Sequence, residues 1–219
     1  MILPEAPTNI HFIWRCHNHS FLLNDDHSKQ FYLDLLAKNK EKYGIQIYGY
    51  AVMSNHFHAV MRIGSRSQWQ NFARTVNSQL AVFVNKNNKR CGQVVMDRPR
   101  TIVLESERDV LAVMRYIELN PLRAGMTKKL KNYRWSSYQH HAQGREDPVV
   151  DDFPALLRMA DSQKKRQMAY RQMFTVQKQD RDMHPRPDFV RVYFIGAAHW
   201  TLKQSQILRA QMREKQAPG

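Results

Sequence analysis

The chain has 219 residues, and its 34 Lys and Arg outnumber its 19 Asp and Glu to give a formal net charge of +15. This length fits one domain of ordinary size, or one catalytic domain with an appendage, and can bury a sizeable core. The excess of positive charge predicts a polyanionic partner, because neutralising phosphates releases condensed counterions. Nucleic acid is the first candidate for that partner, and an anionic membrane surface is the second.

Membrane insertion and cysteine chemistry are both disfavoured. No apolar run approaches the roughly 20 residues that span a bilayer, and the opening MILPEAPTNIHF lacks a basic segment followed by an apolar one. We therefore expect a soluble, intracellular protein with no membrane partner. Cys16 and Cys91 are the only cysteines, and their spacing fits no metal or redox motif, so we expect two reduced thiols.

The first third of the chain alternates β-type and helical runs. Residues 10–15 are rich in β-forming side chains and predict a strand. Residues 28–43 repeat apolar side chains at helical spacing, and Gly44 supplies a C-terminal stop. Residues 45–53 and 56–63, which flank a tight turn, predict a β-hairpin.

A long helix and a short strand are expected next. Ser67 and Gln70 form a capping-box pattern ahead of the helix. One apolar stripe follows at helical spacing and ends at Val84. After a loop, a brief strand is expected at 101–104.

Another helix should follow this strand. Ser106 with Asp109 three residues later predicts its start, and Pro121 disfavours helical geometry in the residue before it, so we expect the helix to end near Leu119. The resulting order is βαββαβα, the split-βαβ or ferredoxin-like pattern. The predicted fold class is therefore α+β, a sandwich with helices on one face of an antiparallel sheet.

The composition changes after Tyr138. Residues 144–156 contain Gly, Pro and four acidic side chains and predict an acidic surface linker. Residues 157–219 are rich in Lys and Arg and include a helical stretch at about 201–215, which predicts a basic, partly helical extension. The expected organisation is a domain at 1–143, the linker, and the extension.

Two histidines open the second strand of the predicted hairpin. Alternate side chains of a strand share a face, so His56 and His58 should point the same way and Phe57 the opposite way. Two imidazoles so placed can hold one cation. A His-x-His on a strand is more often incidental or hydrogen-bonded, so the pair alone is a weak signal.

A tyrosine and an asparagine lie four residues apart on the helix that begins near Ser106. Tyr116 and Asn120 fall on a line that is different from the apolar stripe, so a phenol and an amide are directed toward one place. A lone tyrosine on a helix surface is usually a packing contact. Only the combination with the histidine pair favours a catalytic role.

Three blocks of sequence carry a family resemblance. VMSNHFHAVM (52–61), RYIELNPLRAG (115–125) and YRWSSY (133–138) resemble, in order and separation, the Y1 (HUH) transposases of the IS200/IS605 type. The resemblance covers residues 8–140. The long segment after YRWSSY, with KKRQMAYRQMF (164–174), makes the chain most similar to the REP-associated tyrosine transposases. Ser54 departs from the pattern, since many relatives have proline there, and this affects the hairpin turn rather than the chemistry.

The resemblance implies a metal-dependent single-strand DNA endonuclease and strand-transferase. On the matching positions, the nucleophile is Tyr116, which would form a 5′-phosphotyrosine intermediate, and the metal ligands are His56, His58 and Asn120. The implied partner is REP-like hairpin DNA with an adjoining single strand. A cytoplasmic, nucleoid-associated location in bacteria follows from that partner. The long extension favours a monomer over the dimers of short relatives.

The identity of the metal is less constrained by the residues. Imidazole ligands favour a transition ion over magnesium, whereas the resemblance implies Mg²⁺ or Mn²⁺. We expect Mg²⁺ or Mn²⁺, and no tightly bound structural zinc, because no fourth closing ligand is apparent in the sequence.

Contacts with DNA are expected from basic and aromatic side chains. Arginines near the predicted site, and a basic run in the extension, are candidates for phosphate contacts; they are Arg15, Arg62, Arg98, Arg100, Arg123, Arg134, Lys164, Lys165 and Arg166. Several aromatic rings could stack on unpaired bases, although most such rings are core residues; they are Trp14, Tyr133, Trp135, Tyr138 and His140.

Three other functions fit parts of the sequence. The chain could be an insertion-sequence transposase of the IS200/IS605 type, or a domesticated hairpin-DNA-binding protein that no longer cuts. A cupin-like metalloprotein is disfavoured, because such sites need a glutamate soon after the histidines and the next acid after His58 is Asp97. The basic extension is expected either to grip DNA or to occlude the site.

Overall fold

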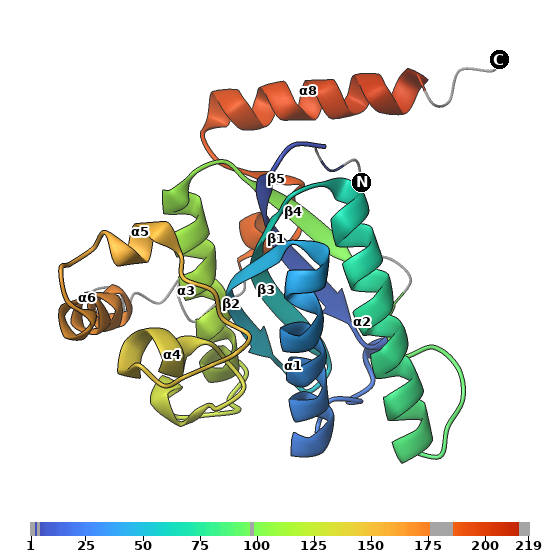
Figure 1. Cartoon of the computed structure of the whole chain (residues 1–219). Coiled ribbons are helices and arrows are strands. Elements are labelled where there is room, and N and C mark those ends of the chain that lie inside the picture. The colour runs from blue at the N-terminus through green and yellow to red at the C-terminus, as the bar shows by residue number, and fades with distance from the viewer. Residues whose placement is uncertain (1–2, 4, 97–98, 176–185, 215–219) are drawn as a thin grey trace.

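The computed structural model describes residues 3, 5–96, 99–175 and 186–214. Its sheet has the strand order β2-β3-β1-β4-β5 (Figure 1). The strands are β1 (Thr8–Arg15), β2 (Ile45–Val52), β3 (His56–Ile63), β4 (Arg100–Leu104) and β5 (Phe194–Ile195). The first four pair antiparallel, and β5 joins the edge parallel to β4. The predicted α+β, ferredoxin-like arrangement is confirmed, and a short strand from the extension makes the sheet mixed.

Helices cover both faces of the sheet. The long helices α1 (Asp26–Lys40) and α2 (Arg66–Asn87) pack together on one face, whereas α3 (Glu107–Arg123) covers the other (Figure 1). Five further α-helices follow among the described residues: α4 (Tyr138–Gln143), α5 (Pro154–Leu157), α6 (Gln163–Thr175), α7 (Pro187–Val190) and α8 (Ala198–Glu214). The expectation of helices on a single face therefore holds for α1 and α2 only.

Strand alternation produces two separate cores. On β1 and β3, Phe12, Trp14 and Phe57 point toward α1 and α2. Val60 of β3 belongs to the second core, under α3. Successive strand side chains point to opposite faces, so the same strands supply both cores.

Two helix boundaries differ from the sequence prediction. The side chain of Ser65, not Ser67, caps α2 by accepting a hydrogen bond from the Gln68 amide. The capping box of Ser106 and Asp109 starts α3 as predicted, but α3 passes through Pro121 and ends at Arg123. Pro121 lies in the last turn of α3, where the loss of one backbone N–H donor costs little. Its own carbonyl accepts a hydrogen bond from the Met126 amide just beyond the helix.

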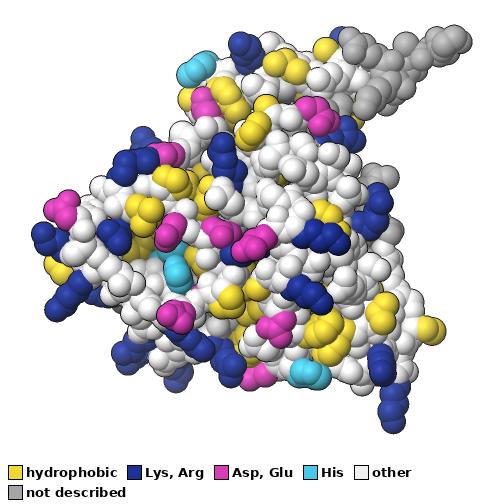
Figure 2. Space-filling model, in the orientation of Figure 1, with side chains coloured by type: hydrophobic (Ala, Val, Ile, Leu, Met, Phe, Trp, Pro, Cys, Tyr) yellow, Lys and Arg dark blue, Asp and Glu magenta, His cyan; other side chains and the backbone are white. Residues whose placement is uncertain are grey.

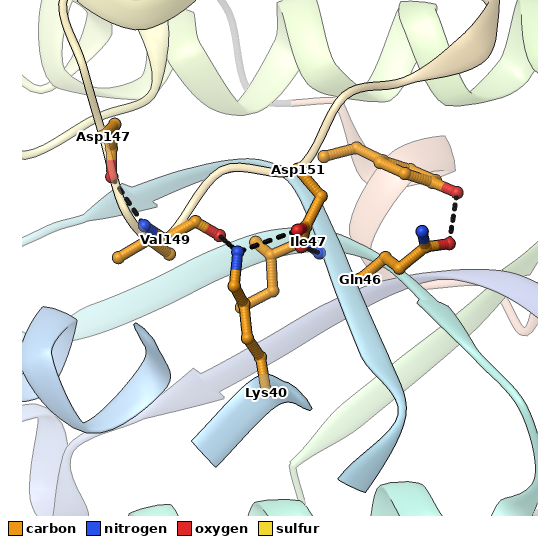
Figure 3. Close-up of polar contacts among 7 residues, drawn as sticks. Lys40, Gln46, Ile47, Asp147, Val149 and Asp151 are labelled. Atoms are coloured by element: carbon orange, nitrogen blue, oxygen red, sulfur yellow. Dashed lines mark hydrogen bonds and ion pairs between the residues drawn. The ribbon is translucent and has the colours of Figure 1, made fainter. Parts of the chain in front are cut away.

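The segment 144–156 is packed against the body of the protein. Lys40, which is buried, donates to the Val149 carbonyl and pairs with Asp151 at 2.8 Å, while Asp151 also accepts from the Ile47 amide (Figure 3). Phe153 is part of the core under α3. The predicted acidic side chains thus fasten this segment to β2 rather than leave it as a surface linker. The domain boundaries stay a prediction.

Helix α3 is also tied to the extension. Glu118, fully buried on α3, accepts hydrogen bonds from the Ser137 hydroxyl (2.5 Å) and from the Tyr170 hydroxyl of α6 (2.8 Å). Burial raises the pKa of Glu118 to about 8. The second and third sequence blocks, RYIELNPLRAG and YRWSSY, therefore meet at this carboxyl group.

Within the described ranges, no helix has the length and apolar character needed to cross a membrane.

Candidate active site

The two histidines of β3 lie on the sheet face that α3 covers. The ring centroids of His56 and His58 are 5.0 Å apart, and Phe57 between them points into the opposite core. His58 is 2% exposed, whereas His56 is half-buried at the end of the strand. The predicted shared orientation of the pair is confirmed.

Each of these rings has one nitrogen engaged. His56 Nδ1 hydrogen-bonds to Asn55 Oδ1 at 2.6 Å, and His58 Nδ1 to His11 Nε2 at 3.0 Å. Burial lowers the pKa of His56 to about 4 and that of His58 well below its ordinary value, so both rings are neutral at pH 7. Neutral imidazole is the form that binds metals.

His11 is a site residue that the sequence prediction missed. Ile13 of β1 pairs with His58 of β3, so His11 lies one diagonal step from His58 on the same face. It is fully buried, and its Nδ1 hydrogen-bonds to the Phe189 carbonyl at 3.0 Å. Burial lowers the pKa of His11 to about 3.

Tyr116 lies across from the histidines on α3. Its ring centroid is 6.2 Å from that of His58 and 6.3 Å from that of His11. Burial raises the pKa of Tyr116, while the positive charges of Arg123 and Arg15 act in the opposite direction. These basic side chains favour the phenolate, but the effect of burial on the pKa of Tyr116 is larger.

Arg123 organises the end of α3 around the tyrosine. Its guanidinium lies 4.6 Å from the Tyr116 ring centroid and donates to the Tyr116 carbonyl and to Asn120 Oδ1. Asn120 Nδ2 is buried and has no partner among the described residues. The amide oxygen that a metal-ligand role requires is thus engaged by Arg123, and the unpaired group is a hydrogen-bond donor.

The donor set fits a cation that takes few protein ligands. With both Nδ1 atoms engaged, the Nε2 atoms of His56 and His58 are the ring nitrogens left to bind a metal. Over the part of the chain that the structure describes, no group of three or more His, Cys, Asp or Glu side chains is arranged as a metal site. Two imidazoles with open positions suit an exchangeable catalytic ion better than a closed structural one.

Helix α7 of the extension covers the tyrosine. The Phe189 ring meets the Tyr116 ring edge-on, with centroids 5.1 Å apart, and Arg186 stacks over Phe189 at 4.4 Å. Arg100 of β4 donates to the Val190 carbonyl. Together with the His11 bond, these contacts hold α7 over the site, and Tyr116 is only 6% exposed.

The family model described as "Transposase IS200 like" matches residues 6–119, just over half of the chain. The chain belongs to the IS200-like transposase family. Proteins of this kind cut and rejoin DNA, so the family match assigns the chain to DNA-processing enzymes in general. No curated protein sequence matches the chain.

Two solved structures resemble this IS200-like transposase. A REP-associated tyrosine transposase bound to a REP hairpin matches with a TM-score of 0.52 and 17% identity, over 71% of this chain and 93% of that one. A candidate transposase from Deinococcus radiodurans R1 matches with a TM-score of 0.39 and 15% identity, over 54% of this chain and 96% of that one. The first likeness confirms the fold expected from the sequence.

The predicted DNA-binding residues of this transposase fall into groups. Arg15 and Arg123 lie close enough to the site for their charges to act on His58 and Tyr116. Arg100 instead holds α7 through the Val190 carbonyl, and Figure 2 shows Lys and Arg spread over much of the visible face with acids interspersed. Arg98 falls outside the described residues; Arg62, Arg134, Lys164, Lys165 and Arg166 are not part of the site's contacts.

The aromatic rings expected to stack on bases are mostly buried. Trp14, Tyr133, Trp135 and Tyr138 are core residues, and Trp14 donates to the Tyr32 hydroxyl in the core under α1. An aromatic side chain in a sequence carries no sign of which face it occupies. Tyr133 and Trp135 instead fasten the third sequence block to β2, through bonds to Val52.

Proposed function

We propose that this IS200-like transposase is a metal-dependent single-strand DNA endonuclease and strand-transferase with Tyr116 as its nucleophile. The observation that carries the proposal is the meeting of Tyr116 with His56 and His58 on one sheet face, from segments that are far apart in sequence. A neutral histidine pair opposite a phenol suits phosphodiester cleavage better than any purely structural role.

His56 and His58 would hold the cation through their Nε2 atoms. A bound Mg²⁺ or Mn²⁺ would neutralise charge on the non-bridging oxygens of the scissile phosphate and fix its position. Asn120 would complete the ligand set if its oxygen leaves Arg123. In its observed orientation, the unpaired Nδ2 donor of Asn120 would instead hold a phosphate oxygen.

The cleavage step conserves the phosphoester. The Tyr116 oxygen attacks phosphorus, and the bond from phosphorus to the 3′ oxygen breaks. The phenol loses a proton, and the departing 3′ oxygen takes one up. The products are a 5′-phosphotyrosyl link and a free 3′-hydroxyl. Attack by a second 3′-hydroxyl reverses the step and joins strands without a nucleotide cofactor. Arg15 and Arg123 favour the attacking phenolate by their charge.

The proposed substrate is a REP-like hairpin with adjoining single-stranded DNA. The net charge of +15 and the basic side chains around the site support a DNA partner. The similar REP-associated transposase is bound to a REP hairpin. We propose that the chain acts as a monomer, since α7 from its own extension contributes to the site.

Incubation with a hairpin-bearing single-stranded oligonucleotide and Mn²⁺ tests this function. Wild type should cleave the strand and form a protein–DNA adduct on a denaturing gel, and Tyr116→Phe should form none. Tyr48→Phe is the matched control, because it removes a hydroxyl from the same sheet face, where the Tyr48 hydroxyl donates to Gln46 Oε1. Equal adduct from wild type and Tyr116→Phe would refute the proposal.

A hairpin-DNA-binding protein without cleavage is the second candidate. The cover of Tyr116 by Phe189 and the raised pKa of the phenol favour it. The same assay separates cleavage from binding without cleavage. If the protein binds the hairpin tightly but forms no adduct, both with α7 present and with α7 removed, it is a binding protein without cleavage.

A further inference from the structure

We propose that His11 is a positioning residue that sets the tautomer of His58 and so keeps the His58 Nε2 lone pair available to a cation. This inference rests on the proposed function, because it assigns to a residue outside the histidine pair the task of preparing a metal ligand. Its basis is a chain of hydrogen bonds from the Phe189 carbonyl through His11 to His58.

The donor and acceptor of each hydrogen bond in this series follow from the carbonyl group at its end. A carbonyl oxygen only accepts, so the His11 Nδ1 that lies 3.0 Å from the Phe189 oxygen carries the proton. In a neutral ring the other nitrogen is then an acceptor, so His11 Nε2 receives a hydrogen bond. Its partner 3.0 Å away, His58 Nδ1, must therefore be the donor. The Nε2 atom of His58 is left with its lone pair.

The surroundings leave His11 and His58 little alternative. His11 is 0% exposed and His58 is 2% exposed, so water cannot replace either bond at low cost. The two ring planes are inclined by only 26° and their centroids lie 5.2 Å apart, as expected for nearly coplanar imidazoles joined edge to edge by the Nδ1–Nε2 hydrogen bond. A misplaced proton on His58 would leave a buried donor where the cation should bind.

The ring of His56 is oriented in the same way by its neighbour in sequence. Its Nδ1 is held by the side chain of the preceding residue, Asn55, at 2.6 Å. His58 has no such neighbour in sequence, and its partner comes from a different strand. Metal-binding histidines commonly donate their second nitrogen to an acceptor that fixes the ring. In this chain a third imidazole performs that function for the buried ligand.

The proton position can be read without any metal. In the full chain, long-range ¹H–¹⁵N correlation spectra of the imidazoles should show His58 with its proton on Nδ1. In His11→Leu, which removes the acceptor, the His58 signals should shift toward the Nε2–H form. In His11→Gln, whose amide oxygen can accept from Nδ1, the wild-type form should be largely restored.

Metal affinity gives a second measurement. In a titration of Mn²⁺ followed by its electron paramagnetic resonance signal, Kd should rise about 10- to 100-fold in His11→Leu and less in His11→Gln. His141→Leu is the matched control, since His141 is another histidine with a lowered pKa that is bonded to a carbonyl, that of Tyr48, but is partly buried and packs against Tyr170 of α6 instead of the histidine pair. It should bind Mn²⁺ like wild type.

The outcomes separate this inference from the proposed function. A wild-type spectrum with His58 protonated at Nε2 overturns the inference without any variant. So does an unchanged His58 tautomer with an unchanged Kd in folded His11→Leu. If wild type instead binds no Mn²⁺ and forms no DNA adduct, the proposed function fails, whereas the metal-free spectrum still decides the role of His11.

Discussion

The two faces of the central sheet use the same strands for different tasks. On β3, Phe57 points into the dry core under α1 and α2, whereas its neighbours His56 and His58 point toward α3 and Tyr116. On β1, Phe12 and Trp14 join the first core while His11 joins the site. The α1 and α2 face is therefore apolar at these positions, whereas the α3 face combines a second apolar core with the polar groups of the site, which contribute less to stability.

This division explains how buried polar side chains can be accommodated on one face of a stable sheet. Burial of apolar side chains on the α1 and α2 face supplies free energy that offsets the cost of burying imidazoles on the other face. The imidazoles remain acceptable because each is hydrogen-bonded. Substitutions on the two faces should accordingly change different properties, and the comparison can be tested residue by residue.

The largest expected effect is on stability. Phe57→Ala removes a fully buried ring and should lower the free energy of unfolding by about 3–5 kcal/mol. His56→Ala, one residue away on the opposite face, should change it by about 1 kcal/mol or less but abolish Mn²⁺ binding. Urea denaturation of both variants measures the difference. Similar losses would contradict the division of faces.

Glu118 gives the next effect, which depends on pH. Its folded pKa of about 8 lies above its ordinary value of 4.5, so its contribution to stability is complete below pH 4.5 and is lost as pH rises through 8. Glu118→Gln keeps hydrogen-bonding groups for Ser137 and Tyr170 but does not ionise.

Unfolding free energies of wild type and Glu118→Gln should therefore diverge between pH 5 and 8.5. The variant should gain on the order of a few kcal/mol relative to wild type across this window. Parallel pH profiles would show that this carboxyl group is ionised in the folded protein at every pH tested.

The cover over Tyr116 predicts a change in rate. Phe189→Ala removes the ring that meets Tyr116 edge-on and should raise the single-turnover rate of DNA cleavage about tenfold, equivalent to ~1.4 kcal/mol. Tyr193→Ala is the control, because Tyr193 lies in the same segment but is exposed. Faster cleavage in both variants, or in neither, would argue against a specific cover.

The smallest expected effect concerns DNA affinity. Arg15→Ala should weaken binding of the single strand a few-fold and lower the slope of log K against log salt concentration by about 0.7, the value for one phosphate contact on a single strand. Lys164→Ala, at an exposed position of α6, should change the slope less. Equal slopes for wild type and Arg15→Ala would remove Arg15 from the DNA contacts.

The sequence predicted the features that depend on local periodicity. The β-hairpin, the shared face of His56 and His58 and the capping box at Ser106 all follow from residues close together in the chain. His11 was missed because its role depends on the register of β1 against β3, which alternation alone does not reveal. The one available signal was that His11 lies between Ile10 and Phe12 in the strand, so its side chain should point to the opposite face from theirs.

The contribution of the extension could not be predicted. Phe189 meets His11 across a sequence separation of 178 residues, and no local pattern marks which part of a basic tail returns to the sheet. The continuation of α3 through Pro121 and the burial of Trp14 and Trp135 likewise depend on tertiary packing. Such packing overrides the local tendencies of the residues involved.

The most direct test of the central claim locates the covalent bond. After reaction with the hairpin oligonucleotide and Mn²⁺, the adduct is digested with nuclease and trypsin, and the peptides are analysed by mass spectrometry. A residual nucleotide should lie on the peptide that contains Tyr116, between Arg115 and Arg123. A nucleotide on any other tyrosine, or cleavage with no modified peptide, would contradict the assignment of Tyr116 as the nucleophile.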